Sequence, residues 1–494
     1  MSLKIITKLL ANRVQKVIIP LLHQNQYGFI KNKSIHDCIS WAFEYLHLCH
    51  QSKKDIVIIK IDFEKAFDMV EHSAILDMLK YMGFGTKYLG WIRNILQTAT
   101  TSVILNGVPG KTIKCRRGVR QGDPLSPLLF VSTAELLQIA VNEAWQQGMI
   151  SLPLDNNYGQ KYPILQYADD TLIIMPADNA QISHLKTVLQ SFTNSTGLKI
   201  NYHKTSMVPI NTAADKTEEL AQILGCKIEA MPLTYLGLPM GTTRPSVEDL
   251  MPTICKLDKR LSGISNLLSH CSRLVVIKSI ISAMPNHIMC ALKVHYTHTD
   301  HMEKSMRIFL WHGKDIERKG SCLIKWDKVC RPKIAGGLGV LKLRDHNKAL
   351  LIKNLYKFYN HHDIPWVNLL WKAYYDNNTI PITNGRKGSF WWRNCLSFLD
   401  EFRSITTCVP ADGATAYLWS DKWTENILEY KFPELFSFAR DKMITVKSAR
   451  VMITDRVQEM FFLPLSMVAF NQYNDLVRII TDIPTDRDKD TWKF

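Results

Sequence analysis

Residues 164–175 read I-L-Q-Y-A-D-D-T-L-I-I-M, an acidic pair set between two apolar runs. The apolar runs predict two β-strands, so that Asp169 and Asp170 lie at the tip of a hairpin. Like charges this close destabilise one another unless a cation compensates them, and hard divalent ions such as Mg²⁺ take carboxylate oxygens. Asp is also an ordinary turn residue, so a solvated turn is the alternative for this stretch taken alone.

A third carboxylate is expected at the end of another strand. Residues 55–68 read D-I-V-I-I-K-I-D-F-E-K-A-F-D. The β-rich run from Ile56 to Ile61 delivers Asp62 at its end, and a helix-compatible stretch follows.

A basic loop separates the two acidic elements. Residues 116–128 read R-R-G-V-R-Q-G-D-P-L-S-P-L, a glycine-punctuated loop that opens into an apolar helix. Such a loop suits an anionic ligand, because helix N-termini and glycine-exposed amides bind phosphate; a solvated basic surface is the alternative. Its cations, with no acid before Asp123, are Lys111, Lys114, Arg116, Arg117 and Arg120.

Taken in order, these three elements resemble motifs A, B and C of reverse transcriptases, in the wording of the non-LTR retrotransposon (LINE-type) branch and especially its plant members. The resemblance covers nearly the whole chain. Further matching segments are Gln26-Tyr27-Gly28-Phe29 with Lys33 and Asp37 (finger motif), residues 197–201 with Lys204 (motif D), Tyr235-Leu236-Gly237 (where palm meets thumb), and Trp326, Pro332-Lys333, residues 336–339 and Asn347 (post-thumb).

The resemblance implies an RNA-directed DNA polymerase, a nucleotidyltransferase in which a primer 3′-hydroxyl attacks the α-phosphorus of a dNTP and pyrophosphate leaves. It implies two Mg²⁺ ions as cofactors, with Mn²⁺ as an alternative metal. On this reading Asp62 and Asp169 bridge both ions, Asp170 is the more peripheral carboxylate, and the backbone carbonyl of Phe63 completes the metal shell.

The resemblance also assigns the nucleotide contacts. Phe67 falls where the family places a bulky aromatic side chain against the sugar 2′ position, which favours dNTP over NTP; a plain core aromatic is the alternative. Arg120, Gln121 and Gly122 match the contact with the incoming nucleotide and template, where glycine permits close backbone approach. Lys204 is the residue assigned to protonate pyrophosphate, although Lys199 is also available and a solvated lysine is the alternative.

The composition agrees with a nucleic-acid enzyme. The chain has 494 residues, and 61 Lys and Arg outweigh 45 acids, which gives a net charge of +16 and a pI near 9.2. This excess attracts phosphate backbones, and the expected partners are an RNA template, a DNA primer and dNTPs. No apolar run reaches the roughly 18 residues that cross a bilayer, and no secretory signal is visible. The 11 cysteines show no paired spacing. The prediction is an intracellular protein of the nucleus or cytoplasm that is not secreted.

The expected fold class is α+β, a right-hand polymerase with palm, partial fingers, helical thumb and a mostly helical C-terminal extension. The predicted boundaries are 1–52 for the fingers, 53–242 for the palm with motifs A to E, 243–345 for the thumb and 346–494 for the post-thumb region. A helix is expected after the acidic hairpin, because apolar residues recur at helical spacing over 182–192. Trp391, Trp392, Trp419 and Trp423 are expected to pack in a core rather than stack on bases. Predicted nucleic-acid contacts are Arg116, Arg117, Arg260, Arg273 and Lys278.

Three alternatives accompany this interpretation. Both ends look trimmed relative to the family, so the chain is expected to be a fragment or decayed copy, and a catalytically inactive RNA-binding remnant is the first alternative. An RNA-dependent RNA polymerase is the second, against which Phe67 and Arg120-Gln121-Gly122 argue. A metal site at His295, His298 and His301 is the third, and it lacks the common tetrahedral pattern.

Overall fold

The computed structural model describes residues 2–155, 161–264, 268–313, 322–375, 380–383, 385–483 and 489–494. The chain divides into two compact units, Met1–Thr243 (unit 1) and Arg244–Phe494 (unit 2). The finer division into fingers, palm, thumb and post-thumb region stays a prediction.

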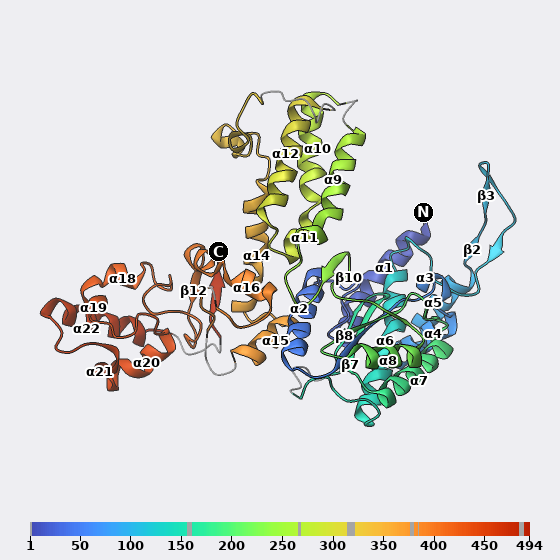
Figure 1. The fold of residues 1–494 in the computed structure, drawn as a ribbon, viewed down its shortest axis with the longest axis horizontal. Coiled ribbons are helices and arrows are strands. Elements are labelled where there is room, and N and C mark those ends of the chain that lie inside the picture. Colours follow the sequence, from blue (N-terminus) through green and yellow to red (C-terminus); the bar gives the residue numbers. More distant parts are fainter. Residues whose placement is uncertain are drawn as a thin grey trace. The chain divides into compact units, whose positions relative to one another are not determined.

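Unit 1 combines helices with a five-stranded sheet (Figure 1). Its helices are α1 (Ser2–Ile18), α2 (Ile35–Gln51), α3 (Ala66–Met69), α4 (His72–Tyr81), α5 (Thr86–Gln97), α6 (Ser126–Gln146), α7 (Asn179–Thr196) and α8 (Ala214–Leu224). Its strands are β1 (Ile56–Ile61), β2 (Thr100–Thr101), β3 (Ile104–Leu105), β4 (Val108–Pro109), β5 (Ile113–Lys114), β6 (Ile164–Tyr167), β7 (Asp170–Pro176), β8 (Ser206–Ile210), β9 (Lys227–Ile228), β10 (Leu233–Tyr235) and β11 (Leu238–Met240).

The sheet has the strand order β6-β7-β1-β8-β9. Strands β6, β7, β1 and β8 pair antiparallel, and β9 joins β8 in parallel. Ile56, Val57, Ile58 and Ile59 of β1 have no exposed surface, so both faces of this strand are covered. This explains why the strand is a continuous apolar run rather than an alternating one, and it confirms the strand predicted from Ile56 to Ile61.

One face of the sheet packs on a layer of helices. Val57, Ile59 and Ile61 share a core with residues of α4, α6 and α7, and Figure 1 shows α6, α7 and α8 grouped beside β7 and β8. The helix predicted after the acidic hairpin is confirmed as α7. It begins where the side chain of Asp178 accepts a hydrogen bond from Gln181 N, and it ends at Gly197 with a φ of 74°.

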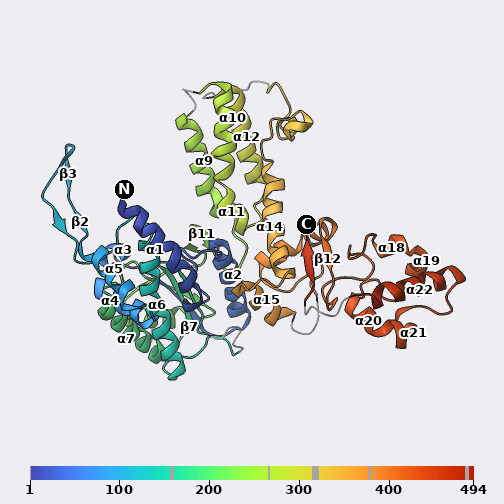
Figure 2. The same cartoon turned by 180° about the vertical axis from the view of Figure 1, so that it is seen from behind.

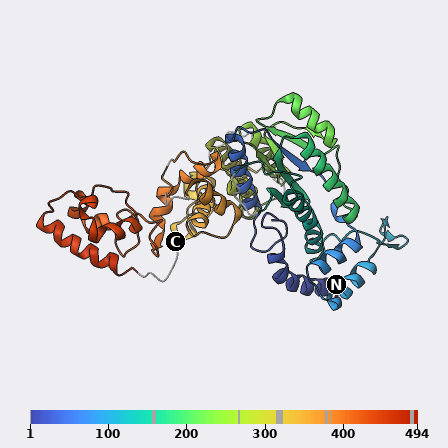
Figure 3. The ribbon, with the colours of Figure 1, turned by 90° about the horizontal axis from the view of Figure 1, so that it is seen from below.

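A long hairpin, formed by β2 to β5, leaves the body of unit 1. Asn106 and Gly107 turn it with φ values of 49° and 84°, the positive values that a two-residue hairpin turn requires. Its apolar side chains, including Leu105 and Val108, are largely exposed. Figures 1, 2 and 3 agree that the hairpin stands clear of the rest of unit 1.

None of the helices in the described part of the chain is long and apolar enough to cross a membrane.

Unit 2 is mostly helical. Its elements are α9 (Met251–Ile264), α10 (His270–Ser279), α11 (Asn286–Ala291), α12 (Tyr296–His312), α13 (Trp326–Val329), α14 (Leu343–Tyr359), α15 (Pro365–Tyr374), α16 (Phe390–Leu396), α17 (Leu399–Ile405), β12 (Thr407–Val409), α18 (Leu428–Lys431), α19 (Pro433–Ser437), α20 (Val446–Asp455), α21 (Val457–Met460), α22 (Met467–Thr481) and β13 (Thr491–Lys493).

The tryptophans of unit 2 are core residues. Trp391, Trp392 and Trp419 are at most 1% exposed, and Trp423 is 8% exposed. Trp391 and Trp392 both pack against Trp366, with ring centroids 5.3 and 6.4 Å away. The prediction that these side chains pack inside the protein is therefore confirmed.

Candidate active site

The acidic pair occupies the hairpin turn that the sequence predicts. Tyr167 pairs with Asp170 at the end of the β6–β7 ladder, so Ala168 and Asp169 form the turn. Ala168 is buried and has a φ of 58°, whereas Asp169 and Asp170 are exposed. The left-handed conformation is unfavourable for a residue with a Cβ, so the surrounding contacts must hold this turn in shape.

Asp62 lies beside this turn on the neighbouring strand. β1 pairs with β7 up to Ile61 opposite Thr171, and one further step in register brings Asp62 to the level of Asp170. The backbone of Asp62 is fixed on its other side, since its amide donates to Thr205 Oγ1 at 3.3 Å and its carbonyl accepts from Asn201 N at 2.8 Å. The three carboxylates therefore lie at the same end of the neighbouring strands β1 and β7.

The electrostatics of the cluster favour a bound cation. Although part of the Asp170 residue is exposed, the protein around its carboxyl group removes enough water to raise its pKa; this burial is the main cause, the charges of Asp169 and Asp62 raise the pKa further, and Lys60 opposes them. Among the described residues, none of the three carboxylates has an ion-pair partner. Carboxylate oxygens without a protein cation are the ligand type that Mg²⁺ prefers, so the donor chemistry fits the implied metal. In the described part of the chain, no three His, Cys, Asp or Glu side chains already lie close enough together to hold a metal ion.

Phe63 follows Asp62 in a short bridge to Ile200. The bridge is made by Asn201 N donating to Asp62 O and by Glu64 N donating to Lys199 O, at 2.8 and 2.9 Å. These bonds do not use the carbonyl oxygen of Phe63.

The basic loop packs directly onto the segment that follows Asp62. Val119 N donates to Phe67 O at 2.8 Å, and Gly118 N donates to Val70 O at 2.7 Å. Gln121 Nε2 reaches Asp68 Oδ1 at 3.4 Å, although the two residues are 53 positions apart in sequence. The structure therefore brings the predicted nucleotide-contact loop beside Phe67.

A cavity of 530 Å³ opens along this loop. Arg117, Arg120 and Gln121 line it together with Thr100 and Thr101 at the base of the long hairpin. Arg116 and Arg117 are exposed, and so is Gly122, which has a φ of 79°. Asp68 and Asp123 also line the cavity, so its two arginines offer contacts for an anionic ligand beside two carboxylates.

Phe67 is half-buried and held by two other rings. It stacks on Phe130 of α6 with centroids 4.5 Å apart and planes at 15°, and Phe29 meets it edge-on at 6.1 Å. One part of the ring is therefore a core aromatic, as the alternative interpretation states, while its partial exposure leaves room for a second role.

Lys204 lies in the turn after Asn201, where its amide donates to Asn201 O at 3.1 Å and to Asn201 Oδ1 at 3.2 Å. Its side chain is exposed, as is that of Lys199. Asn201 itself bonds the backbone of Asp62, so both lysines belong to the segment that supports the first carboxylate.

The other predicted nucleic-acid contacts belong to unit 2. Arg260 is exposed on α9. Arg273 is partly committed within its own unit, since its Nε donates to Leu268 O at 3.1 Å and its guanidinium lies against Gly313. Lys278 lies near Gly339.

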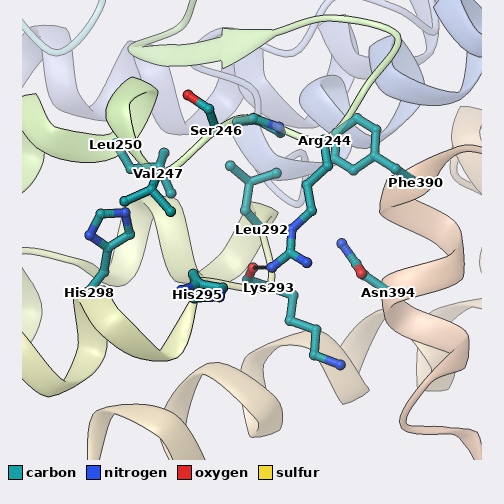
Figure 4. Close-up of a pocket in the computed structure, with 11 residues that line it drawn as sticks. Arg244, Ser246, Val247, Leu250, Leu292, Lys293, His295, His298, Phe390 and Asn394 are labelled. Atoms are coloured by element: carbon teal, nitrogen blue, oxygen red, sulfur yellow. Dashed lines mark hydrogen bonds between the residues drawn. The ribbon is translucent and has the colours of Figure 1, made fainter.

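Unit 2 also holds a smaller cavity of 210 Å³, drawn in Figure 4. Figure 4 shows Arg244 reaching toward Lys293, whose carbonyl oxygen accepts from Arg244 Nη2 at 3.1 Å. His295 and His298 line this cavity, but Nε2 of His301 lies 2.9 Å from Asp258 Oδ2 instead. The three histidines therefore do not converge on one point.

Sequence reasoning missed the support beneath the acidic turn. The hydroxyl of Tyr235 donates to Asp170 O at 3.4 Å and lies 3.8 Å from Cys38 Sγ. Burial is the main cause that raises the pKa of Tyr235 and brings that of Cys38 to about 12, so both groups stay protonated. The signal in the sequence was Tyr235-Leu236-Gly237, which indicated a domain junction but no contact with the hairpin.

Comparison with known proteins agrees with this geometry. Residues 1–240 match the family described as reverse transcriptase (RNA-dependent DNA polymerase). A putative ribonuclease H protein of Arabidopsis thaliana is 30% identical over 34% of this chain and 28% of its own length. The transposon TX1 149 kDa protein of Xenopus laevis is 21% identical over 72% of this chain and 26% of its own length. A Pol polyprotein of the R2 retrotransposable element of Popillia japonica is 28% identical over 44% of this chain and 36% of its own length.

Unit 1 therefore corresponds to a reverse transcriptase domain, in which the basic loop packs on the segment that follows Asp62. Residues 1–240 match the reverse transcriptase family, and the similar proteins include those of the TX1 transposon and the R2 retrotransposable element. The chain spans about a quarter to a third of the length of these curated relatives.

Proposed function

We propose that the chain is an RNA-directed DNA polymerase, which extends a DNA primer on an RNA template with dNTPs. The observation that carries the proposal is that Asp62, Asp169 and Asp170 lie at the same end of strands β1 and β7. None of the three has an ion-pair partner among the described residues. The match of residues 1–240 to the reverse transcriptase family supports the same reaction.

Asp62 and Asp169 would hold two Mg²⁺ ions between them, with Asp170 at the periphery and the carbonyl of Phe63 as a further ligand. The ions, when bound, lower the pKa of the primer hydroxyl and neutralise charge on the leaving pyrophosphate. A bound cation would oppose the effects that raise the pKa of Asp170 and so favour its charged form.

The neighbouring residues would bind and select the nucleotide. The exposed part of Phe67 would face the sugar 2′ position and exclude a hydroxyl group there. Arg120 would contact the triphosphate, and Gln121 with Gly122 would border the nascent base pair. Lys204 would donate a proton to the leaving pyrophosphate.

We assign residues 53–242 to the palm, 1–52 to part of the fingers, 243–345 to the thumb and 346–494 to a post-thumb region. Arg116 and Arg117 of unit 1, together with Arg260, Arg273 and Lys278 of unit 2, would contact the phosphate backbone of the template and primer. A protein that copies RNA into DNA would act in the nucleus or the cytoplasm.

The test is Mg²⁺-dependent dNTP incorporation on a primed RNA template by the purified chain. Asp169→Asn keeps the side-chain shape but removes its charge, so extension should be lost while the thermal unfolding profile is retained. Asp77→Asn changes an exposed carboxylate on α4 and serves as the matched control. Activity that survives Asp169→Asn would refute the two-metal assignment. If the unchanged chain binds the primer-template but does not extend it, the RNA-binding remnant is the better description.

A further inference from the structure

Residues 25–27, which precede α2, pair with strand β6 of the acidic hairpin on the side away from β7. Gln26 bridges Gln166 of β6 in parallel. Tyr27 N donates to Gln166 O at 2.8 Å, and Gln166 N donates to Asn25 O at 3.0 Å. Segments 140 positions apart in sequence are therefore joined by backbone hydrogen bonds beside the proposed metal-binding turn.

The side chain of Gln26 reaches into the turn itself. It has no exposed surface, and its Oε1 accepts two hydrogen bonds, from Gly28 N at 2.9 Å and from Ala168 N at 3.2 Å. Its Nε2 donates to Gln166 Oε1 at 3.4 Å. Ala168 is the turn residue with the left-handed φ, and the amide oxygen of Gln26 accepts from its buried backbone N–H.

Gly28 shows how closely the two segments fit. A Cβ at this position would lie 2.4 Å from Ala168 N, which leaves no space for any side chain. Lys33 holds the other end of the segment, because its Nζ donates to the carbonyls of His23, Gln24 and Gln26 at 3.1, 2.9 and 2.8 Å. The segment that carries Gln26, whose Oε1 accepts from Ala168 N, is thus itself held in place.

We propose that Gln26 is a positioning residue for the reaction, whose amide oxygen sets the Ala168 turn and so the direction of Asp169 and Asp170. This inference rests on the proposed polymerase function for its catalytic consequence. Without the acceptor, the buried amide of Ala168 has no partner and the turn relaxes. A displacement of the carboxylates by about 1 Å is enough to lower turnover by about 100-fold.

The experiment compares Gln26→Met with Gln166→Met. Both variants remove a fully buried amide side chain from the same pair, but only the first removes the acceptor of Ala168 N. For Gln26→Met we expect a kcat about 100-fold lower, a Mg²⁺ requirement at least about 10-fold higher and an unchanged KM for dNTP. Gln166→Met should retain the Mg²⁺ requirement of the unchanged chain. The same Mg²⁺ requirement in both variants, raised or not, would overturn the proposal.

Two readouts do not depend on turnover, so failure of the inference can be told from failure of the proposed function. Mn²⁺ binding, followed by electron paramagnetic resonance, should weaken in Gln26→Met and not in Gln166→Met. In the unchanged chain, residue-resolved hydrogen exchange should find the Ala168 amide protected like a strand amide, while the neighbouring Asp169 amide exchanges fast. Equal, fast exchange of both amides would overturn the proposal even if Gln26→Met does not fold.

Discussion

Gly118 touches the backbone of Asp68 so closely that a Cβ on Gly118 would lie 2.6 Å from Asp68 O. This contact joins the basic loop to the segment that follows Asp62, and the bond from Gly118 N to Val70 O at 2.7 Å reinforces it. Gly122 lies in the same loop with the same φ of 79°, but a Cβ on Gly122 would meet no atom within 4 Å.

The two glycines therefore allow a matched prediction. Gly122→Ala costs only the left-handed backbone conformation, about 1 kcal/mol of unfolding free energy. Gly118→Ala adds a backbone clash and should cost about 3 kcal/mol or more, with loss of nucleotide binding as the loop moves. Urea unfolding of both variants checks the difference. Equal losses would mean that the loop is not held against Asp68.

Phe67 tests whether a partly buried ring also selects the sugar. Phe67→Val should raise the ratio of NTP to dNTP incorporation by about 10-fold or more, because the space beside the 2′ position opens; it should also cost about 1–2 kcal/mol of stability. Phe130→Leu removes the ring that stacks on Phe67, so it should lower stability without changing the ratio. Single-nucleotide extension with each substrate measures the ratio. A ratio that stays constant in Phe67→Val would leave Phe67 as a core aromatic only.

Changes at Arg116 and Arg117 test the proposal that these residues contact nucleic acid. If each neutralises one phosphate, the double change to Gln should reduce the slope of log affinity against log salt by about 1.4–1.8. Lys80→Gln removes an exposed charge on α4 and should leave the slope nearly unchanged. Fluorescence anisotropy with a labelled primer-template over a salt series gives these slopes. A double variant with the slope of the unchanged chain would remove both arginines from the interface.

Local sequence patterns predict the strands and the hairpin that hold the three carboxylates, whereas contacts between distant segments are visible only in the structure. The run from Ile56 to Ile61 and the acidic hairpin follow from side-chain type and spacing over a few residues. The contacts of Gln26 with Ala168 and of Tyr235 with Asp170 join distant segments, and no periodicity reveals them. The hairpin formed by β2 to β5 is not among the predicted elements, although Asn106-Gly107 between apolar residues is a strong hairpin signal.

A buried acid in the core of unit 1 gives the chain an expected pH dependence. Glu135 of α6 is 3% exposed, and its Oε1 accepts from His23 N at 2.8 Å. Burial raises the pKa of Glu135 to about 8, although the hydrogen bond from His23 N and the charges of Lys161 and Lys33 each lower it. Burial, helped by the same two lysines, lowers the pKa of the His23 side chain to about 3. Both groups are therefore neutral in the folded protein at mildly acidic pH.

The signs of the two shifts predict where stability is lost. Because folded Glu135 holds its proton more tightly than the unfolded chain does, its contribution to stability falls as the pH rises from about 4.5 to about 8. His23 acts in the opposite direction, and its contribution falls as the pH drops below about 6.5. Glu135→Gln keeps the acceptor for His23 N but cannot ionise, so it should raise the unfolding free energy at pH 8.5, by about 5 kcal/mol at most, and change it little at pH 5. Urea unfolding at both pH values measures this, and an equal change at the two values would mean that Glu135 does not titrate in this range.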